Sequence, residues 1–351
     1  MAVAERVSER VERLRAALEE PLLVTTGVNV RYLIGFESSN AALFIDDERL
    51  LLFTDFRYAE AARSLEGVEF VKSQRSLLKT IGATLDGRIA FEASALSYDG
   101  WETLGDGGLE LVPRKGLVES LRAVKDESEL ETIREAARIT DRVYAAFAEE
   151  RFVGRTERDL AWRLEQIFHE LGAHGTAFES IVGSGPTGAL PHGRPTDRVV
   201  EPNTTVVVDT GALFEGYNSD CTRTFATGDL PDDLAQAYDA CLRGQLAGLD
   251  AMRGGVSGAD VDAAARNVIE DAGFGEKFGH GLGHGVGLLV HEAPAARPES
   301  EDVLEPGNVI TCEPGIYLEG RGGVRIEDLV VITEDEPELL SSYTKELVTV
   351  R

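Results

Sequence analysis

Carboxylates stand inside apolar, strand-like runs at three points in the second half of the chain. Asp209 follows three valines in VVVDTG, Glu313 lies in VITCEPG, and Glu327 lies in VRIEDLVVI. Burial of an ionised carboxylate in such a strand is costly unless the group is paired with a cation or bound to a metal. The three acids therefore predict a cationic partner close to them.

Histidines are the second group of residues that could do chemistry. The segment HGLGHGVGLLVHE places His280, His284 and His291 among glycines, and turns at those glycines are expected to bring the imidazoles close to one site. Imidazoles and carboxylates together are typical ligands of divalent-metal centres. We therefore expect a metal centre in this half of the chain.

A short internal repeat relates two of the acidic segments. EPNTTVVVDTG and EPGNVITCEPG align at an offset of 104 residues, so that Asp209 matches Glu313. In each copy the apolar strand supplies one acid and the returning strand supplies another, which is Asp220 in the first copy and Glu327 in the second. Two related hairpins are thus predicted to supply four acids.

Charge counting favours two metal ions over one. Four carboxylates contribute a charge of about −4, which two divalent cations would neutralise, with an imidazole completing the ligands. Two ions about 3.5–4 Å apart can share a bridging water and polarise a carbonyl group, so the predicted reaction class is hydrolysis. Neighbours of these acids in the strands are expected to point to the opposite face, and these are Asp328, Cys221 and Cys312.

The elements that position these residues are predicted to form two domains. A chain of 351 residues is long enough for about two. Residues 1–120 alternate short apolar runs with helix-like stretches, which predicts an α/β domain. Residues 121–351 begin with two amphipathic helices, continue through a loop rich in Gly and Pro into the first hairpin, and return to helices and then strands. This order predicts a second domain that begins with two long helices and ends rich in strands.

The composition excludes several kinds of partner. The chain carries 35 basic and 62 acidic residues, a formal net charge of −27, which repels nucleic acid and anionic lipid. It has no run of eighteen apolar residues and no apolar signal core at its start, so we expect a cytoplasmic protein that does not span a membrane. Three cysteines without CxxC spacing predict reduced thiols, with Cys241 on a helix as a packing residue.

The balance of basic residues bears on the environment. Only six of the 35 are lysines, and with so many carboxylates this favours a protein adapted to concentrated salt, which screens self-repulsion. The alternative is an ordinary acidic enzyme with arginine-biased codons.

Six segments carry a resemblance that runs almost end to end. NVRYLIGFESSN and TDFRYAEAA in the first domain, and ALPHGRPTDR, VVVDTGALFEGYNSDCTRTF, HGLGHGVGLLVHEAP and ITCEPGIYLEGRGGVRIED in the second, resemble the pita-bread metallopeptidases of the Xaa-Pro peptidase type (prolidase and proline aminopeptidase). The resemblance implies a creatinase/prolidase-like α/β N-terminal domain that gates access and contributes to a homodimer. It implies an α+β pita-bread catalytic domain with a pseudo-twofold repeat.

The resemblance also implies roles for individual residues. Asp209 would bind one ion, His284 and Glu313 the other, and Asp220 and Glu327 would bridge the two. The remaining roles fall to residues beside the metals: His192 and His291 would hydrogen-bond the scissile group or its tetrahedral intermediate, Glu313 would also act as general base, and His280 would not be a ligand.

The resemblance implies cleavage of the bond between an N-terminal residue and proline in small proline-containing peptides. Two divalent ions per subunit are expected, from among Mn, Co, Fe and Zn, with Mn or Co favoured. Leu289 stands where many relatives carry Glu, and Ala295 where prolidase-like members carry an Arg for the substrate carboxylate; Arg297 could substitute only if the loop differs.

Three alternatives remain open. The chain could be a hydrolase of the same fold with another substrate, such as a creatinase-like enzyme or a methionine aminopeptidase, although the latter leaves the first domain unexplained. It could be a non-catalytic pita-bread binding protein, although such a protein should have lost ligands. A Cys/His nucleophilic enzyme would lose activity on thiol alkylation and ignore chelators.

Overall fold

The computed structural model describes the backbone of residues 3–351 and the side chains from Glu9 onward. The chain divides into two compact units, the first ending at Arg122 and the second covering Ala123–Arg351. This division lies two residues beyond the boundary predicted at residue 120. No helix within residues 3–351 is both long and apolar enough to cross a bilayer.

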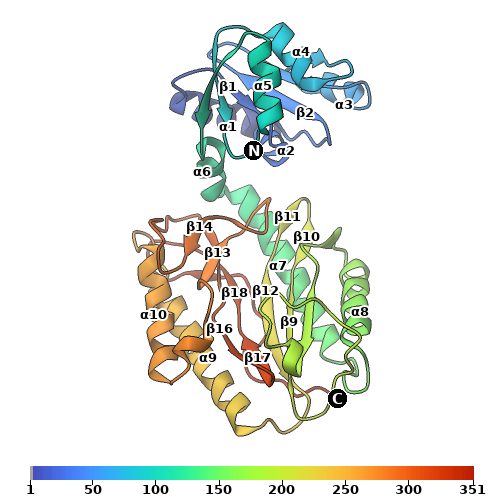
Figure 1. Cartoon of the computed structure of the whole chain (residues 1–351), viewed down its shortest axis with the longest axis vertical. Helices are drawn as coiled ribbons and strands as arrows, with labels where there is room; N and C mark the ends of the chain where they lie inside the picture. The colour runs from blue at the N-terminus through green and yellow to red at the C-terminus, as the bar shows by residue number, and fades with distance from the viewer. Residues whose placement is uncertain (1–2) are drawn as a thin grey trace. The chain divides into compact units, whose positions relative to one another are not determined.

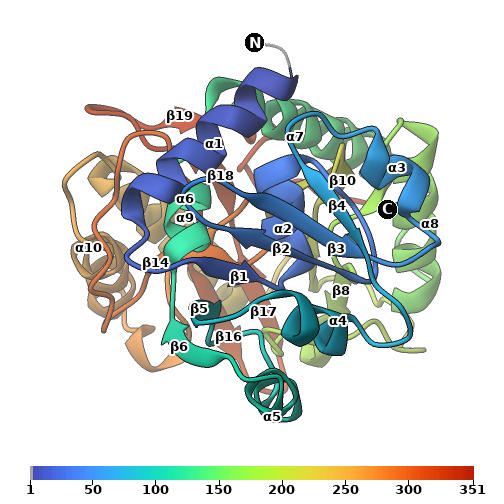
Figure 2. The ribbon, with the colours of Figure 1, turned by 90° about the horizontal axis from the view of Figure 1, so that it is seen from above.

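The first unit is built on one mixed sheet of six strands in the order β4-β3-β2-β1-β5-β6, and Figure 2 shows β1 to β4 side by side. Strands β1, β2 and β3 pair antiparallel, whereas β3–β4, β1–β5 and β5–β6 are parallel. The strands are β1 (Leu22–Val24), β2 (Ala41–Ile45), β3 (Leu50–Thr54), β4 (Glu69–Lys72), β5 (Arg88–Glu92) and β6 (Glu110–Arg114).

Helices alternate with these strands, as the predicted α/β class requires. They are α1 (Val3–Ala17), α2 (Gly27–Ile34), α3 (Ala59–Arg63), α4 (Leu77–Thr84), α5 (Tyr98–Asp106) and α6 (Leu117–Ala123). Apolar side chains of the central strands and of α4 and α5 form one buried cluster. The α/β organisation of the first domain is therefore confirmed.

The second unit places strands between two pairs of helices (Figure 1). The helices are α7 (Glu127–Phe147), α8 (Glu157–Glu170), α9 (Asp232–Ala251) and α10 (Gly258–Asp271). Side-chain caps fix where three of them begin: Asp126 and Glu129 form a capping box at α7, and Thr156 and Ser257 cap α8 and α10. One apolar core packs α7 and α8 against strands, and a second packs α9 and α10 against others.

The strands of the second unit form several small antiparallel sheets, which confirms the α+β class. The sheets are β12-β9-β8, β11-β10-β7, β14-β13-β15-β18-β19 and β16-β17. The bounds are β7 (Gly175–Thr176), β8 (Ile181–Ser184), β9 (Thr205–Thr210), β10 (Ala212–Phe214), β11 (Tyr217–Asn218), β12 (Cys221–Ala226), β13 (Gly283–Gly285), β14 (Glu292–Ala296), β15 (Val309–Cys312), β16 (Gly315–Leu318), β17 (Gly322–Arg325), β18 (Asp328–Val331) and β19 (Glu338–Leu339). Short 3-10 turns occur at Gly185–Thr187 and Gly275–Lys277.

The two predicted hairpins are present, but their registers differ. In the first, β9 pairs with β12 so that Thr222 lies opposite Asp209. In the second, β15 pairs with β18 so that Cys312 lies opposite Asp328, and one further step in this register sets Glu313 against Glu327. The residue of the first hairpin that corresponds to Glu327 is therefore Thr222. Asp220, which the sequence repeat matched to Glu327, lies two residues earlier.

Candidate metal centre

Three carboxylates from the two hairpins meet at one point. One oxygen each of Asp209, Asp220 and Glu327 lies within 4.8 Å of the others. Asp209 belongs to β9, Asp220 directly precedes β12, and Glu327 directly precedes β18. Asp220 and Glu327 are 5% and 1% exposed, so residues more than 100 positions apart place negative charge in the same buried space.

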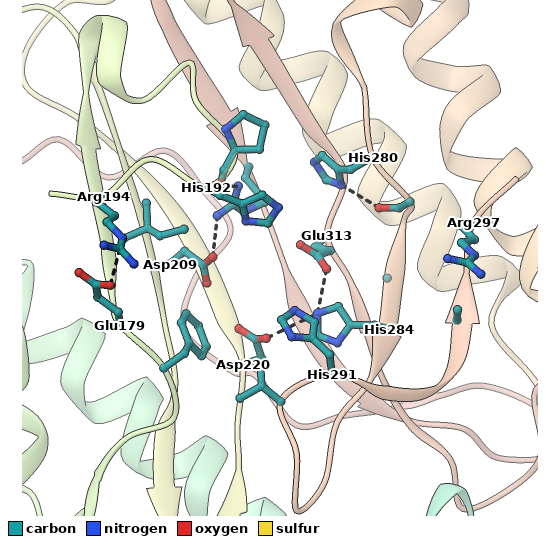
Figure 3. A pocket seen from close by; sticks show the side chains of 18 of the residues that line it. Glu179, His192, Arg194, Asp209, Asp220, His280, His284, His291, Arg297 and Glu313 are labelled. Carbon is teal, nitrogen blue, oxygen red and sulfur yellow. Dashed lines mark hydrogen bonds and ion pairs between the residues drawn. The ribbon is translucent and has the colours of Figure 1, made fainter. Parts of the chain in front are cut away.

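His284 and Glu313 complete the set of five predicted ligands. His284 Nε2 lies 3.2 Å from Glu313 Oε1 and 3.7 Å from Asp220 Oδ2. Glu313 directly follows β15, and Thr311 donates a hydrogen bond of 3.2 Å to its Oε1. In Figure 3, Asp209 and Asp220 face His284 and Glu313. The structure therefore brings all five side chains to one place.

Glycines let His284 reach this position, although not by forming turns. Gly283 and Gly285 lie with His284 in strand β13, and neither has a positive φ angle. A Cβ on Gly283 would stand 2.0 Å from Thr311 O, and one on Gly285 would stand 2.2 Å from Ala293 O. The expectation of glycine-rich turns is therefore wrong here, because these glycines serve close backbone approach between strands.

Arg325 is a buried cation of the centre that the sequence analysis missed. It is 3% exposed, and its guanidinium donates to Asp209 Oδ2 at 2.6 Å, to Thr222 Oγ1 at 3.0 Å and to Tyr317 Oη at 2.8 Å. Thr222 in turn donates to Glu327 Oε2 at 2.7 Å. The predicted charge balance was incomplete, since four carboxylates and Arg325 together carry about −3. A signal was present, because an arginine two residues before Glu327 shares its side of an extended strand.

Asp328 points away from the cluster, as predicted, but it is a buried member of a second network. Its side chain is fully buried and accepts bonds from Arg223 at 2.8 Å, Gln245 at 2.9 Å and Lys345 at 2.5 Å. Arg223 also donates to the backbone oxygen of Glu327. This network supports Glu327 from behind and has no sequence signal, because its members are far apart in the chain.

The three cysteines are free and buried. Cys221 and Cys312 point to the backbone oxygens of Glu327 and Gln245, and Cys241 lies on α9. Burial raises the pKa of all three thiols, so none is an activated nucleophile.

Asp209, Asp220, His284 and Glu313 line a cavity of about 650 Å³, and Glu327 lies behind them next to Asp209 and Asp220. His192 and His291 line it, and the ring of His291 lies 4.3 Å from that of His284. His280 also lines it but is turned to Tyr317 Oη at 2.9 Å and to Gly281 O at 2.8 Å. The apolar part of the wall is formed by Phe178, Ile181, Pro191, Pro195 and Val290. Both predicted substrate-side histidines thus lie beside the predicted ligands.

Of the two positions at which the chain departs from its expected pattern, Ala295 lies at this cavity and Leu289 does not. Arg297 lines the cavity together with Ala295. In Figure 3, Arg297 lies on the opposite side of the acids from Glu179 and Arg194, which pair at 3.3 Å. Leu289 is 44% exposed and is not among the lining residues.

Burial and mutual repulsion shift the pKa values of the acids in the centre. The pKa of Asp220 is raised by burial and then by the charges of Glu327 and Asp209, and the pKa of Glu327 is raised by burial and then by Glu313 and Asp209. Burial also acts to raise the pKa of Glu313, but the hydrogen bond and charge of His284 lower it to about 2. The centre therefore holds negative charge that protons or cations must offset.

The residues present fit divalent cations. Asp209 Oδ1 and Glu327 Oε1 are buried and, within the described part of the chain, have no hydrogen-bond partner. Buried carboxylate oxygens of this kind call for an ion or a water. Carboxylates with one imidazole are suitable ligands for Mn, Fe, Co or Zn, so the donor set matches the predicted dinuclear centre.

Each of the two units matches a known protein family. Residues 131–334 match the model of metallopeptidase family M24, and residues 10–124 match the creatinase/prolidase N-terminal domain. An uncharacterized peptidase, YqhT, of Bacillus subtilis is 37% identical over 93% of this chain and 95% of its own length.

Solved structures agree with these matches. The Xaa-Pro dipeptidase of Bacillus anthracis superposes with a TM-score of 0.95 at 35% identity, covering 98% of this chain and 100% of the other. The X-Pro aminopeptidase of Thermotoga maritima superposes with a TM-score of 0.88 at 33% identity, covering 97% and 100%. Because the family model spans most of the second unit and the likeness extends through both, the chain belongs to the pita-bread metallopeptidases of family M24.

Proposed function

We propose that this protein is a metal-dependent Xaa-Pro peptidase that hydrolyses the bond between an N-terminal residue and a following proline. The observation that carries the proposal is the convergence of Asp209, Asp220, His284, Glu313 and Glu327 at one place, where the first four line a cavity. The names of the structural relatives, an Xaa-Pro dipeptidase and an X-Pro aminopeptidase, support the same substrate class.

The chemistry divides between the cations and the protein. Two divalent ions, when bound, supply Lewis acidity toward the scissile carbonyl and the attacking water. Asp209, Asp220, His284, Glu313 and Glu327 would hold them. Glu313 is ionised at neutral pH because His284 lowers its pKa to about 2, which is the form that accepts a proton.

His192 and His291 line the cavity beside the acids. Their ring N–H groups can donate hydrogen bonds to the scissile carbonyl as negative charge develops on its oxygen. The pKa of His291 is lowered by burial and by the charge of His284, so a neutral donor is available near pH 7.

The cavity wall suits a proline ring. An Xaa-Pro bond is a tertiary amide, which has no N–H to donate. The wall therefore needs no acceptor for the bond nitrogen, and the apolar side chains of Phe178, Ile181 and Val290 can cover the ring.

We further propose that dipeptides are preferred over longer peptides. Arg297 lines the cavity and, among the described residues, has no carboxylate within ion-pair distance. Such a cation is suited to the terminal carboxylate of an Xaa-Pro dipeptide. We also propose manganese or cobalt as the metal, a homodimer as the assembly and the cytoplasm as the location.

The decisive experiment compares three peptides with and without chelator. We expect Ala-Pro to be cleaved faster than Ala-Pro-Gly and Ala-Ala to resist, with EDTA abolishing cleavage and Mn²⁺ or Co²⁺ restoring it. The His284→Ala variant should not be restored. A metal-loaded sample that cleaves neither proline peptide contradicts the proposal.

A further inference from the structure

A buried ion pair joins the first residues of the second unit to the strand that follows His291. Lys125 Nζ lies 2.7 Å from Glu292 Oε1, and their side chains are only 1% and 7% exposed. Lys125 Nζ also donates to Ala123 O at 3.3 Å. Glu292 directly follows His291 and opens β14, and neither member of the pair has a part in the chemistry described above.

The pair fixes one end of the loop that carries His291. Glu292 Oε2 accepts a bond of 3.4 Å from the backbone of Leu289. Gly287 packs against the pair so closely that a Cβ there would stand 2.3 Å from Glu292 Oε1 and 3.1 Å from Lys125 Cε. The loop is therefore shaped around the ion pair.

The same loop is held from its other side by the first hairpin. Asn218, two residues before Asp220, donates to Gly287 O from its backbone at 2.9 Å and from its side chain at 3.0 Å. Lys125 is itself anchored, because its backbone N–H donates to Gly307 O at 2.9 Å. His291 thus emerges from a segment held at both ends by buried groups.

The choice of lysine supports a specific role. The chain has 29 arginines and 6 lysines, yet one of those few lysines occupies this position with almost no exposure. A lysine ammonium is a compact charge, whereas a guanidinium is a wide planar fork. The ammonium of Lys125 donates to Ala123 O and pairs with Glu292 Oε1, an arrangement that suits a compact charge.

We propose that Lys125 and Glu292 are a positioning pair that holds the imidazole of His291 against the reacting carbonyl. This inference rests on the proposed function, since it assigns the pair to the same reaction. Because the pair acts through His291, its loss reduces turnover and leaves metal binding intact.

The test uses two variants, Lys125→Met and Lys125→Met/Glu292→Gln. The single variant leaves a buried carboxylate without its cation and lowers the melting temperature. The double variant removes both charges, keeps similar volumes and folds. We expect the double variant to bind two metal ions per chain, to lose kcat by about tenfold to a hundredfold, and to change KM by less than about threefold.

A second readout does not depend on activity. The chain has six histidines, so their ring resonances can be assigned in ¹³C-labelled protein with single His→Gln variants. In the zinc-loaded double variant we expect the His291 resonance to shift or broaden while those of His169 and His174 stay unchanged.

Arg134→Met is the control for loss of a paired cation away from the cavity. Arg134 makes an ion pair of the same 2.7 Å length with Glu338 in the same unit, and neither residue lines the cavity. Its loss should leave kcat and the His291 resonance as in the parent. The proposal is overturned if the folded double variant keeps the parent's kcat, or if kcat falls while the His291 resonance does not move. An inactive parent would contradict the proposed function instead, and the resonance comparison would still decide the placement of His291.

Discussion

At the residue scale, the hydroxyl group of Thr222 orients one acid of the centre. Thr222 Oγ1 donates to Glu327 Oε2 and accepts from Arg325 Nε, so one side chain connects a predicted metal ligand to the buried cation. Thr205, on the neighbouring strand β9, has an equally buried hydroxyl with no partner in the described part of the chain. The two threonines form a natural pair for comparison.

Replacing Thr222 by valine is predicted to lower the free energy of unfolding by about 1–3 kcal/mol, because it leaves a buried carboxylate oxygen and a guanidinium N–H unpaired. Metal affinity should fall with it, since Glu327 loses its orientation. The matched change Thr205→Val should be neutral or stabilising. Denaturant titration and metal titration of both variants measure the difference, and equal effects would argue against this role of Thr222.

Metal loading is predicted to release protons. In the metal-free protein burial and repulsion raise the pKa of Asp220 and Glu327, so these acids retain protons at pH values at which ordinary carboxyls are ionised. A binding cation must displace them. Calorimetry in two buffers of different ionisation enthalpy should give different binding heats, and affinity should fall as the pH is lowered. Identical heats in both buffers would show that no proton leaves.

The raised pKa values also set the sign of a stability effect without metal. An acid whose pKa is raised on folding stabilises the fold at low pH, and this contribution is lost as the pH rises from the ordinary carboxyl pKa to the raised one. Metal-free protein should therefore melt at a lower temperature at pH 7 than at pH 5, and the metal-loaded protein should lack this loss. Thermal scans at both pH values, with and without Mn²⁺, measure it.

At the residue scale the sequence predicts the acids but not their supports. Asp209, Glu313 and Glu327 are recognisable because a carboxylate in an apolar strand needs a cation. Arg325 follows from the same reasoning applied to a basic residue. Lys125 and Glu292, 167 residues apart, could not be paired from the sequence, because nothing local to either residue indicates the other.

At the scale of elements, strand β13 is the one most constrained by its neighbours. It presents His284 from between two other backbones, and a Cβ on Gly283 would stand 2.0 Å from Thr311 O. Gly279, directly before the glycine-rich segment, has nothing within 4 Å of such a Cβ. A restricted glycine and an unrestricted glycine therefore lie four residues apart.

Gly283→Ala is predicted to force β13 away from β15 and to displace His284, with at least a tenfold loss of metal affinity and a lower melting temperature. Gly279→Ala should change neither quantity appreciably. Metal titration followed by competition with a chelator compares the two variants. A Gly283→Ala protein that binds metal like the parent would show that the strand tolerates the shift.

Prediction of the elements succeeded where side chains carry the signal. The valines of β9 and the amphipathic faces of α7 and α8 are well predicted because propensity and burial agree. Strand β13 was expected to be a turn because glycine has no strand propensity; its extended shape is imposed by β14 and β15. The register of the hairpins was equally out of reach, since the repeat matches one acid of each returning strand but does not fix which residues pair across the two strands.

At the scale of the whole molecule, repulsion from the net negative charge affects stability more than the exposed ion pairs do. The net charge is −27, and exposed pairs such as Arg88–Glu110 and Arg114–Glu19 contribute little each. Self-repulsion is screened as the Debye length falls from about 10 Å at 0.1 M salt to about 3 Å at 1 M.

The melting temperature is therefore predicted to rise as the KCl concentration is raised from about 0.1 M to about 2 M. Calorimetry after dialysis measures this, with sucrose at matched osmolality as the control for general exclusion from the protein surface. A melting temperature that stays level or falls with KCl would favour the ordinary acidic enzyme over the salt-adapted one.

The two halves of the centre differ in the charged groups beside their acids, and this difference has a consequence for how metal ions bind. Asp209 pairs with the guanidinium of Arg325, whereas Glu313 lies beside the imidazole of His284. The two metal sites are therefore chemically distinct, although the strands that carry these acids are similar in sequence. Occupancy should accordingly proceed in two separable stages as metal is supplied, and a half-filled form should dominate when the ion is scarce. The rate of turnover would then depend on the supply of the ion that is bound more weakly.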